Sequence, residues 1–135
     1  MKKDIEIPTV NGVYVAIVQE YSLEGDVIWN VYLVNDKEEP LENTFVSSKG
    51  YLKEVSGAES KTSTLRHYFK VVAAKTSIKI EPIMPALFKL NNEYFVSFYL
   101  NGNLFDKKYI FLSETIKDSN LSKVPILEKD GVWIK

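Results

Sequence analysis

The stretch "NEYFVSFYLNGNLFDKKYIFL" (Asn92–Leu112) carries the clearest structural signal in this chain of 135 residues. Two runs rich in aromatic residues flank the sequence Asn101-Gly102-Asn103. Asn-Gly between two apolar runs favours a tight turn between antiparallel strands, because asparagine and glycine tolerate the positive φ that such turns need. The stretch therefore predicts a β-hairpin.

The regions on either side of this hairpin have the composition of strands as well, because they are rich in β-branched and aromatic residues. No stretch keeps a helical period over three turns. A turn containing Gly25 separates the first two runs. The predicted strands are "VYVAIVQEY" (Val13–Tyr21), "VIWNVYLVN" (Val27–Asn35), "LENTFVSSKGY" (Leu41–Tyr51), "STLRHYFKVV" (Ser63–Val72), "AKTSIKIEPI" (Ala74–Ile83) and a last short strand that carries Trp133.

Seven or eight strands with turn residues between them predict an all-β sandwich or barrel, and the runs that are apolar on both faces favour an antiparallel β-sandwich. The length predicts a single domain over residues 1–135. The connections are expected to be a polar surface loop that ends near Thr62, a proline-containing crossing over "IMPALFKL" (Ile83–Leu90), a short helical turn capped by Ser113 or Asp118, and an Asp-Gly turn at Asp130-Gly131.

Composition restricts the class of protein. The chain is 45% hydrophobic and 26% charged, with a net charge of −1, so a basic excess for nucleic acid or a membrane surface is missing. The absence of cysteine excludes disulfides, thiolate zinc sites and cysteine nucleophiles. The opening "MKKDIEIPTV" lacks the apolar run of a signal peptide. A soluble cytoplasmic protein without a membrane partner is the expectation.

The residues that support catalysis or cofactor binding are sparse. The chain has one histidine, and its six glycines are isolated rather than gathered in a phosphate-binding loop. The acidic residues around Asp36 lack the spacing of a calcium loop. We therefore expect no cofactor, no metal and no enzyme activity. A hydrolase that uses Ser60 or Ser63 with His67 is the least favoured alternative.

The segment "KTSTLRH" (Lys61–His67) contains the single arginine and the single histidine side by side. On a regular strand, Arg66 and His67 point to opposite faces of the sheet. The planar guanidinium of Arg66 binds carboxylates with two parallel hydrogen bonds, which predicts an internal bridge to a carboxylate such as Glu81 or, less favoured, a contact to a partner. Lys61, Arg66 and His67 form the candidate binding set.

Two stretches resemble known sandwich domains. The run "VIWNVYLVNDKEEPLENTFVSSKGY" (Val27–Tyr51) resembles the early strands of immunoglobulin-like and fibronectin-like sandwiches, which implies an immunoglobulin-like antiparallel β-sandwich for this chain. In "LNNEYFVSFYL" (Leu90–Leu100), Tyr94 is similar to a tyrosine corner. That resemblance implies a tyrosine hydroxyl that ties a loop to its own backbone.

As a whole, the chain resembles a family of small uncharacterised bacterial proteins of nearly this length. The resemblance covers "MKKDIEIPTV", "KTSTLRH", "FKLNNEYFVSFY" and "LFDKKYIF". Members of that family sometimes carry the label phenylalanyl-tRNA synthetase α subunit. This chain lacks the several arginines and the size that such a synthetase needs, so the resemblance implies a family and not an activity.

The sequence therefore favours a non-enzymatic interaction or assembly module. Edge strands, end loops or an aromatic patch would bind a protein partner or a second copy. The alternative is an RNA- or tRNA-associated accessory protein, indicated by the family label and by Lys107 and Lys108 beside Tyr109 in the hairpin. The net charge of −1 argues against nucleic acid.

Overall fold

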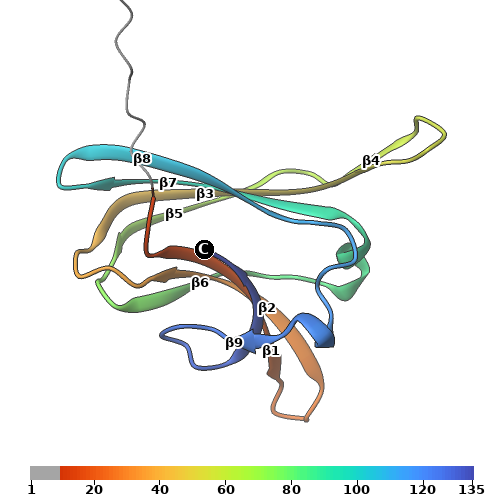
Figure 1. The fold of residues 1–135 in the computed structure, drawn as a ribbon, viewed down its shortest axis with the longest axis horizontal. Helices are drawn as coiled ribbons and strands as arrows, with labels where there is room; N and C mark the ends of the chain where they lie inside the picture. The colour runs from red at the N-terminus through yellow and green to blue at the C-terminus, as the bar shows by residue number, and fades with distance from the viewer. Residues whose placement is uncertain (1–9) are drawn as a thin grey trace, which may run out of the picture.

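The computed structural model describes residues 10–135, and the opening segment that contributes to the family resemblance lies outside them except for Val10. Two antiparallel sheets are stacked face to face, as Figure 1 shows nearly edge-on. Sheet A has the order β6-β2-β1-β10-β9, with β1 at Val13–Tyr21, β2 at Val27–Asn35, β6 at Thr76–Pro82, β9 at Ser122–Lys123 and β10 at Asp130–Ile134.

Sheet B is built around β3, which is hydrogen-bonded to neighbours on both of its sides. One side of β3 pairs with β7, and β7 pairs with β8. The other side is shared by two strands, because β5 pairs with the first part of β3 and β4 with its last three residues. The bounds in this sheet are β3 at Leu41–Lys53, β4 at Glu59–Lys61, β5 at Leu65–Val72, β7 at Asn91–Leu100 and β8 at Asn103–Phe111.

The all-β sandwich predicted from the sequence is confirmed. The first two strands have the predicted bounds. The Asn-Gly hairpin is confirmed too, because Leu100 pairs with Asn103 and both turn residues have positive φ, 51° at Asn101 and 80° at Gly102. Ten strands are present within residues 10–135 rather than seven or eight, and the additions are short: β4 has three residues and β9 has two.

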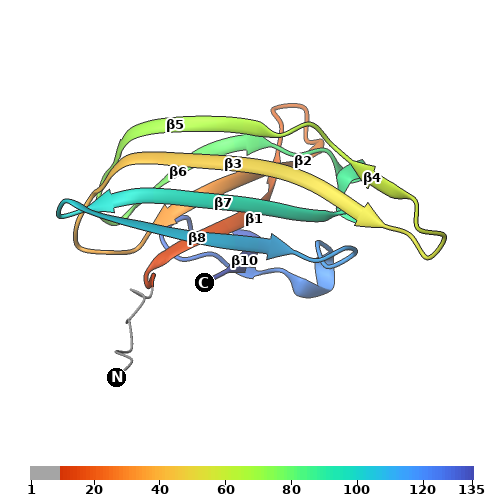
Figure 2. The ribbon, with the colours of Figure 1, turned by 90° about the horizontal axis from the view of Figure 1, so that it is seen from above.

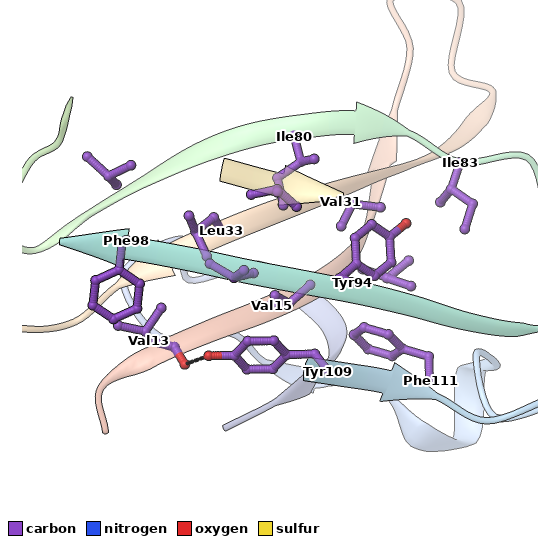
Figure 3. Packing of buried hydrophobic residues seen from close by; sticks show 14 of the residues in the cluster. Val13, Val15, Val31, Leu33, Ile80, Ile83, Tyr94, Phe98, Tyr109 and Phe111 are labelled. Carbon is purple, nitrogen blue, oxygen red and sulfur yellow. Dashed lines mark hydrogen bonds between the residues drawn. The ribbon is translucent and has the colours of Figure 1, made fainter. Parts of the chain in front are cut away.

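The hydrophobic core lies between the sheets, where inward side chains of both layers meet (Figure 3). Val13, Val15 and Ile17 of β1 are fully buried, and Tyr94 of β7 is 1% exposed. The Tyr109 hydroxyl of β8 donates a hydrogen bond of 2.6 Å to the backbone carbonyl of Val13, which joins the two sheets inside the core. Burial raises the pKa of Tyr109 above its ordinary value, so the hydroxyl keeps its proton and remains a donor.

A second, smaller apolar cluster lies on the outer side of sheet A. Val18 and Val34 of the sheet pack there with Val124, which belongs to the C-terminal part of the chain. Trp133 adds its ring to this cluster and lies 5.3 Å from the ring of Tyr14. The C-terminal segment therefore covers part of sheet A that would otherwise expose apolar side chains.

The expected Asp-Gly turn before the last strand is wrong, because Asp130 and Gly131 belong to β10 itself. Gly131 lies opposite Val18, and a Cβ atom placed on it would stand 2.8 Å from the Ile17 carbonyl oxygen and 2.9 Å from Val124 Cγ2. Close packing between β1 and the C-terminal segment, rather than a turn conformation, therefore requires glycine at this position.

We expect Gly131→Ala to lower the free energy of unfolding by about 1–3 kcal/mol, the usual cost of forcing an extra methyl group into a packed site. Urea denaturation measures this change. Asp130→Ala is the control, because the Asp130 side chain is exposed in the same strand. It should change stability by less than about 0.5 kcal/mol. Equal effects of the two substitutions would contradict the packing argument.

The polar segment after Tyr51 was expected to be a surface loop, and that interpretation is wrong for residues 52–53 and 59–61, which pair as strands. β3 continues to Lys53 and pairs with β4, so residues 51–61 form a hairpin arm that projects from one end of the sandwich (Figures 1 and 2).

The connection between β6 and β7 and the connection between β8 and β9 each contain a short 3₁₀ helix, η1 at Pro85–Lys89 and η2 at Asp118–Asn120. Neither η1 nor η2 has a side-chain cap, so the cap expected from Ser113 or Asp118 is not formed.

Candidate functional site

The hydroxyl-rich run Thr62–Thr64 forms a β-bulge between β4 and β5. Two β3 residues, Lys49 and Gly50, stand against these three residues, while the pairing on either side of them is regular. Thr62 holds the bulge in place with its backbone N–H on the Gly50 carbonyl (2.9 Å) and its Oγ1 accepting from the Gly50 N–H (2.8 Å). Bulges of this kind re-aim the neighbouring side chains.

The bulge separates Lys61 from the other two predicted site residues, and strand alternation places Arg66 and His67 on opposite faces of β5. Lys61 lies on the exposed arm and pairs with Glu59 at 3.4 Å. Arg66 is exposed on the outer face of sheet B, opposite Ser47. His67, one residue later, points into the space between the sheets. Arg66 and His67 lie on opposite faces of the sheet, as predicted. Lys61, Arg66 and His67 therefore do not form one binding site.

The predicted bridge from Arg66 to Glu81 is wrong. His67 makes this contact, with its Nε2 2.7 Å from Glu81 Oε1, and its side chain is 27% exposed. Arg66 makes no ion pair within residues 10–135, because strand alternation turns its guanidinium away from β6. The neighbouring histidine therefore occupies the place that the sequence assigned to the arginine.

Glu81 is the centre of a polar cluster at the edge of the core. Its side chain is 10% exposed. The Ser48 hydroxyl lies 3.0 Å from both carboxylate oxygens, and the Tyr94 hydroxyl donates to Oε2 at 3.2 Å. Burial is the main cause that raises the pKa of Tyr94, and the nearby charge of Glu81 raises it further. The tyrosine therefore keeps its proton and donates a hydrogen bond to the carboxylate.

This contact also corrects the expected tyrosine corner. The Tyr94 hydroxyl donates a hydrogen bond to the Glu81 carboxylate on β6 of the opposite sheet instead of to its own loop backbone.

The serine–histidine arrangement of a hydrolase is not formed within the part of the chain that the structure describes. No serine hydroxyl bonds His67 there, because Ser60 lies on the exposed arm, Ser63 is exposed in the bulge, and the His67 ring bonds Glu81.

A pocket of about 310 Å³ opens beside the polar cluster, between the bulge and η1. Gly50 and Thr62 lie on one side of it, and Leu87 of η1 lies on the other. Its lining residues are Ser48, Lys49, Gly50, Thr62, Ser63, Leu65, Glu81, Pro82, Ile83, Leu87, Asn92 and Tyr94. Two residues of the hydroxyl run, Thr62 and Ser63, therefore line this pocket.

The second feature is an exposed aromatic face on the outer side of sheet B. We define the aromatic face as Phe45, Tyr68, Phe95, Tyr99 and Leu104, which are between 38% and 55% exposed. Phe45 is its centre, because Tyr68 lies directly opposite with ring centroids 4.8 Å apart. Phe95 is a diagonal neighbour of Phe45 on β7, and Leu104 lies opposite Tyr99.

A second bulge turns Phe45 outward. Leu41 and Thr44 are both fully buried although they are three residues apart, so the alternation of β3 reverses between them. The register between β3 and β7 shifts there, and Asn43 has a φ of 46°. The Asn43 side chain accepts a hydrogen bond from the Tyr68 hydroxyl at 2.6 Å. Neither Phe45 nor Asn43 was singled out from the sequence, because strict alternation from Leu41 places Phe45 inside.

Charged residues surround the aromatic face. Arg66 lies beyond Ser47 in the row of side chains that also contains Phe95, and Lys108 lies opposite Phe95 on β8. Asp106 occupies the neighbouring row. The face therefore combines aromatic rings and an arginine, the residue types that are enriched at protein interfaces.

A second polar cluster, around Glu20, joins the C-terminal segment to sheet A. Glu20 Oε1 accepts from Asn30 at 2.7 Å and from the Tyr32 hydroxyl at 2.9 Å, while Oε2 pairs with Lys129. Burial raises the pKa of Glu20, but the hydrogen bonds from Lys129, Asn30 and Tyr32 outweigh it and the pKa is lowered. Burial, followed by the contact with Glu20, raises the pKa of Tyr32 to about 12.

Within residues 10–135, no group of three or more histidine, aspartate or glutamate side chains is arranged to hold a metal ion. None of the helices in this part of the chain has the length and apolar character needed to cross a membrane. Comparison with protein-family models, with curated proteins and with solved structures finds no match. The resemblance to the bacterial family therefore stays a prediction.

We expect His67→Ala to lower the free energy of unfolding by about 1–3 kcal/mol, because it removes a donor from the nearly buried Glu81 carboxylate. Arg66→Ala is the matched control on the exposed side of the same strand and should change stability by less than about 0.5 kcal/mol. Chemical denaturation of both variants measures the difference. A larger loss in Arg66→Ala would contradict the assignment of the structural role to the histidine.

The lowered pKa of Glu20 predicts a pH-dependent contribution to stability. A carboxylate whose pKa is lower in the folded state stabilises the protein fully above its ordinary value of 4.5, and this contribution disappears as the pH falls through the folded-state pKa. Glu20→Gln should therefore be less stable than the natural protein near neutral pH, and the two should converge in acid. Denaturation midpoints measured across this range give the comparison. A stability difference that stays constant with pH would contradict the prediction.

Proposed function

We propose that this protein is a non-enzymatic β-sandwich interaction module that binds a protein partner through the aromatic face. The observation that carries the proposal is the exposure of Phe45, Tyr68, Phe95, Tyr99 and Leu104 together on one side of sheet B. Contiguous exposed apolar side chains with polar residues around them mark contact surfaces of proteins.

The energetics of this face support a contact of useful strength. Full burial of one phenylalanine side chain contributes about 1.5–3 kcal/mol, and the face offers several large side chains around Phe45. Aromatic residues and arginine are also the residues that most often dominate binding energies. Arg66 and Lys108 flank Phe95, which favours a partner surface that is apolar with carboxylates near its rim.

Immunoglobulin-like connectivity is part of the proposal. In such domains the strand B pairs with E in one sheet, and F lies between C and G in the other. The pairing of β2 with β6, and the position of β7 between β3 and β8, support this assignment. β10 and β9 extend sheet A beyond β1 and are additions to that plan. A cytoplasmic location also belongs to the proposal, supported by a cysteine-free composition.

RNA association is the second candidate function. Bases stack on exposed aromatic rings beside cationic side chains, and Phe45 and Phe95 with Arg66 and Lys108 offer that combination. The aromatic face carries Asp106 as well, and the net charge of the chain is −1, which weakens the attraction to phosphates. Protein binding is therefore the preferred function, and salt-dependent filter binding of tRNA distinguishes the two.

We expect the Phe45→Ser variant to lose the proteins that the natural chain retains in affinity capture from its native extract, because it removes the centre of the face. Tyr21→Ser is the matched control, since Tyr21 is 66% exposed at the end of β1 in the other sheet. Thermal melts establish that both baits are folded. Retention of the same partners by all three baits, or by none of them, contradicts the proposal.

A further inference from the structure

The pocket between the bulge and η1 has the character of a binding site, and it is separate from the aromatic face. Its volume of about 310 Å³ lies at the lower end of the range found for small-molecule sites, roughly 300–1,000 Å³. Leu65, Ile83 and Leu87 give it apolar walls, while Glu81 and Asn92 supply polar groups. Apolar walls with a few polar groups are the usual design of such sites.

The carboxylate of Glu81 keeps capacity for one more hydrogen bond. A carboxylate offers about four lone-pair positions. Three donors occupy it: the ring N–H of His67, the Ser48 hydroxyl and the Tyr94 hydroxyl. The Ser48 hydroxyl lies 3.0 Å from both oxygens of Glu81, but its one proton can occupy only one acceptor position. Three of the four positions on the carboxylate are therefore occupied, and one remains open. Glu81 lines the pocket, so a ligand there can reach this position.

Asn92 provides a second acceptor. Its Nδ2 donates to the backbone carbonyls of Leu87 (2.9 Å) and Leu90 (3.1 Å), which fixes the orientation of the amide. Its Oδ1 accepts no hydrogen bond within residues 10–135 and lies 3.4 Å from the Cβ position of Gly50, on the pocket side. The residue is 4% exposed, so this acceptor faces the pocket rather than open solvent.

The charged group inside the pocket is the negative carboxylate of Glu81. Glu81 and Lys49 are the charged residues of the lining. The Lys49 ammonium lies 3.8 Å from Glu93 and its side chain is half exposed, so it belongs to the outer face of sheet B. A negative charge and a free amide oxygen therefore face a short apolar cavity, which favours a ligand that is rich in donors and positively charged.

We propose that this pocket binds a primary ammonium group on a short aliphatic chain, with the ammonium on Glu81 and Asn92 and the chain against Leu87 and Ile83. Two of the three N–H donors of one ammonium match the two open acceptors, and the apolar walls of the pocket suit its aliphatic chain. The group can come from a free small amine or from a lysine side chain of another protein. This site is independent of the aromatic face.

The test uses amide chemical shifts of the full chain during titration with n-pentylammonium, with n-pentanol and pentanoate as probes of the same shape. Pentylammonium should shift the amides of Gly50, Ser63 and Leu87 at concentrations on the order of millimolar, and pentanoate should not. Glu81→Gln keeps the shape of the side chain and should weaken ammonium binding by about tenfold or more, the effect of losing a charge-assisted hydrogen bond.

A second pair of variants keeps the test valid if Glu81→Gln is unstable. Ser63→Phe places a ring at the exposed rim of the pocket and should abolish binding, while Ser56→Phe on the turn of the arm should leave it unchanged. Titration with N-acetyl-lysine methylamide separates the two sources of the ammonium: a response identifies a lysine side chain, and its absence beside a pentylammonium response identifies a free amine. Equal responses to pentylammonium and pentanoate, or no response to either, overturn the proposal.

Discussion

The alternation of side chains along β3 is the constraint on which both candidate surfaces depend. A strand buries one row of side chains and exposes the other, so each irregularity in its pairing reassigns every residue beyond it. β3 meets two such irregularities. The first, at Asn43, turns Phe45 outward and creates the centre of the aromatic face. The second, opposite Thr62–Thr64, separates β4 from β5 and opens the pocket at the end of the sandwich.

Much of the architecture could be predicted because it rests on local signals. The first two strands are continuous apolar runs bounded by turn residues, and their ends were predicted to the residue. The Asn101-Gly102 turn depends on two adjacent residues that tolerate positive φ. Such features need no knowledge of what packs against them. The exposed arm was missed because its polar composition resembles a loop, while its pairing depends on the backbone alone.

The polar cluster could not be predicted because its members come from four strands. Ser48, His67, Glu81 and Tyr94 lie on β3, β5, β6 and β7, and only the stacking of the sheets brings them together. The sequence did point to Glu81 as an internal partner, but it assigned the arginine and not the histidine to it. Alternation on β5 decides between these neighbours, and the bulge before that strand sets its phase. Gly131 is similar, since its close contact with Ile17 joins distant parts of the chain.

The apolar cluster of Val18, Val34 and Val124 has a consequence for assembly. The C-terminal segment covers part of the outer side of sheet A, whereas the aromatic face on the outer side of sheet B is exposed. If two copies associate through the proposed aromatic face, each copy covers the face of the other, and the result is a closed pair with twofold symmetry. Growth into filaments needs a second, different contact surface on each subunit, which association through the aromatic face alone does not supply.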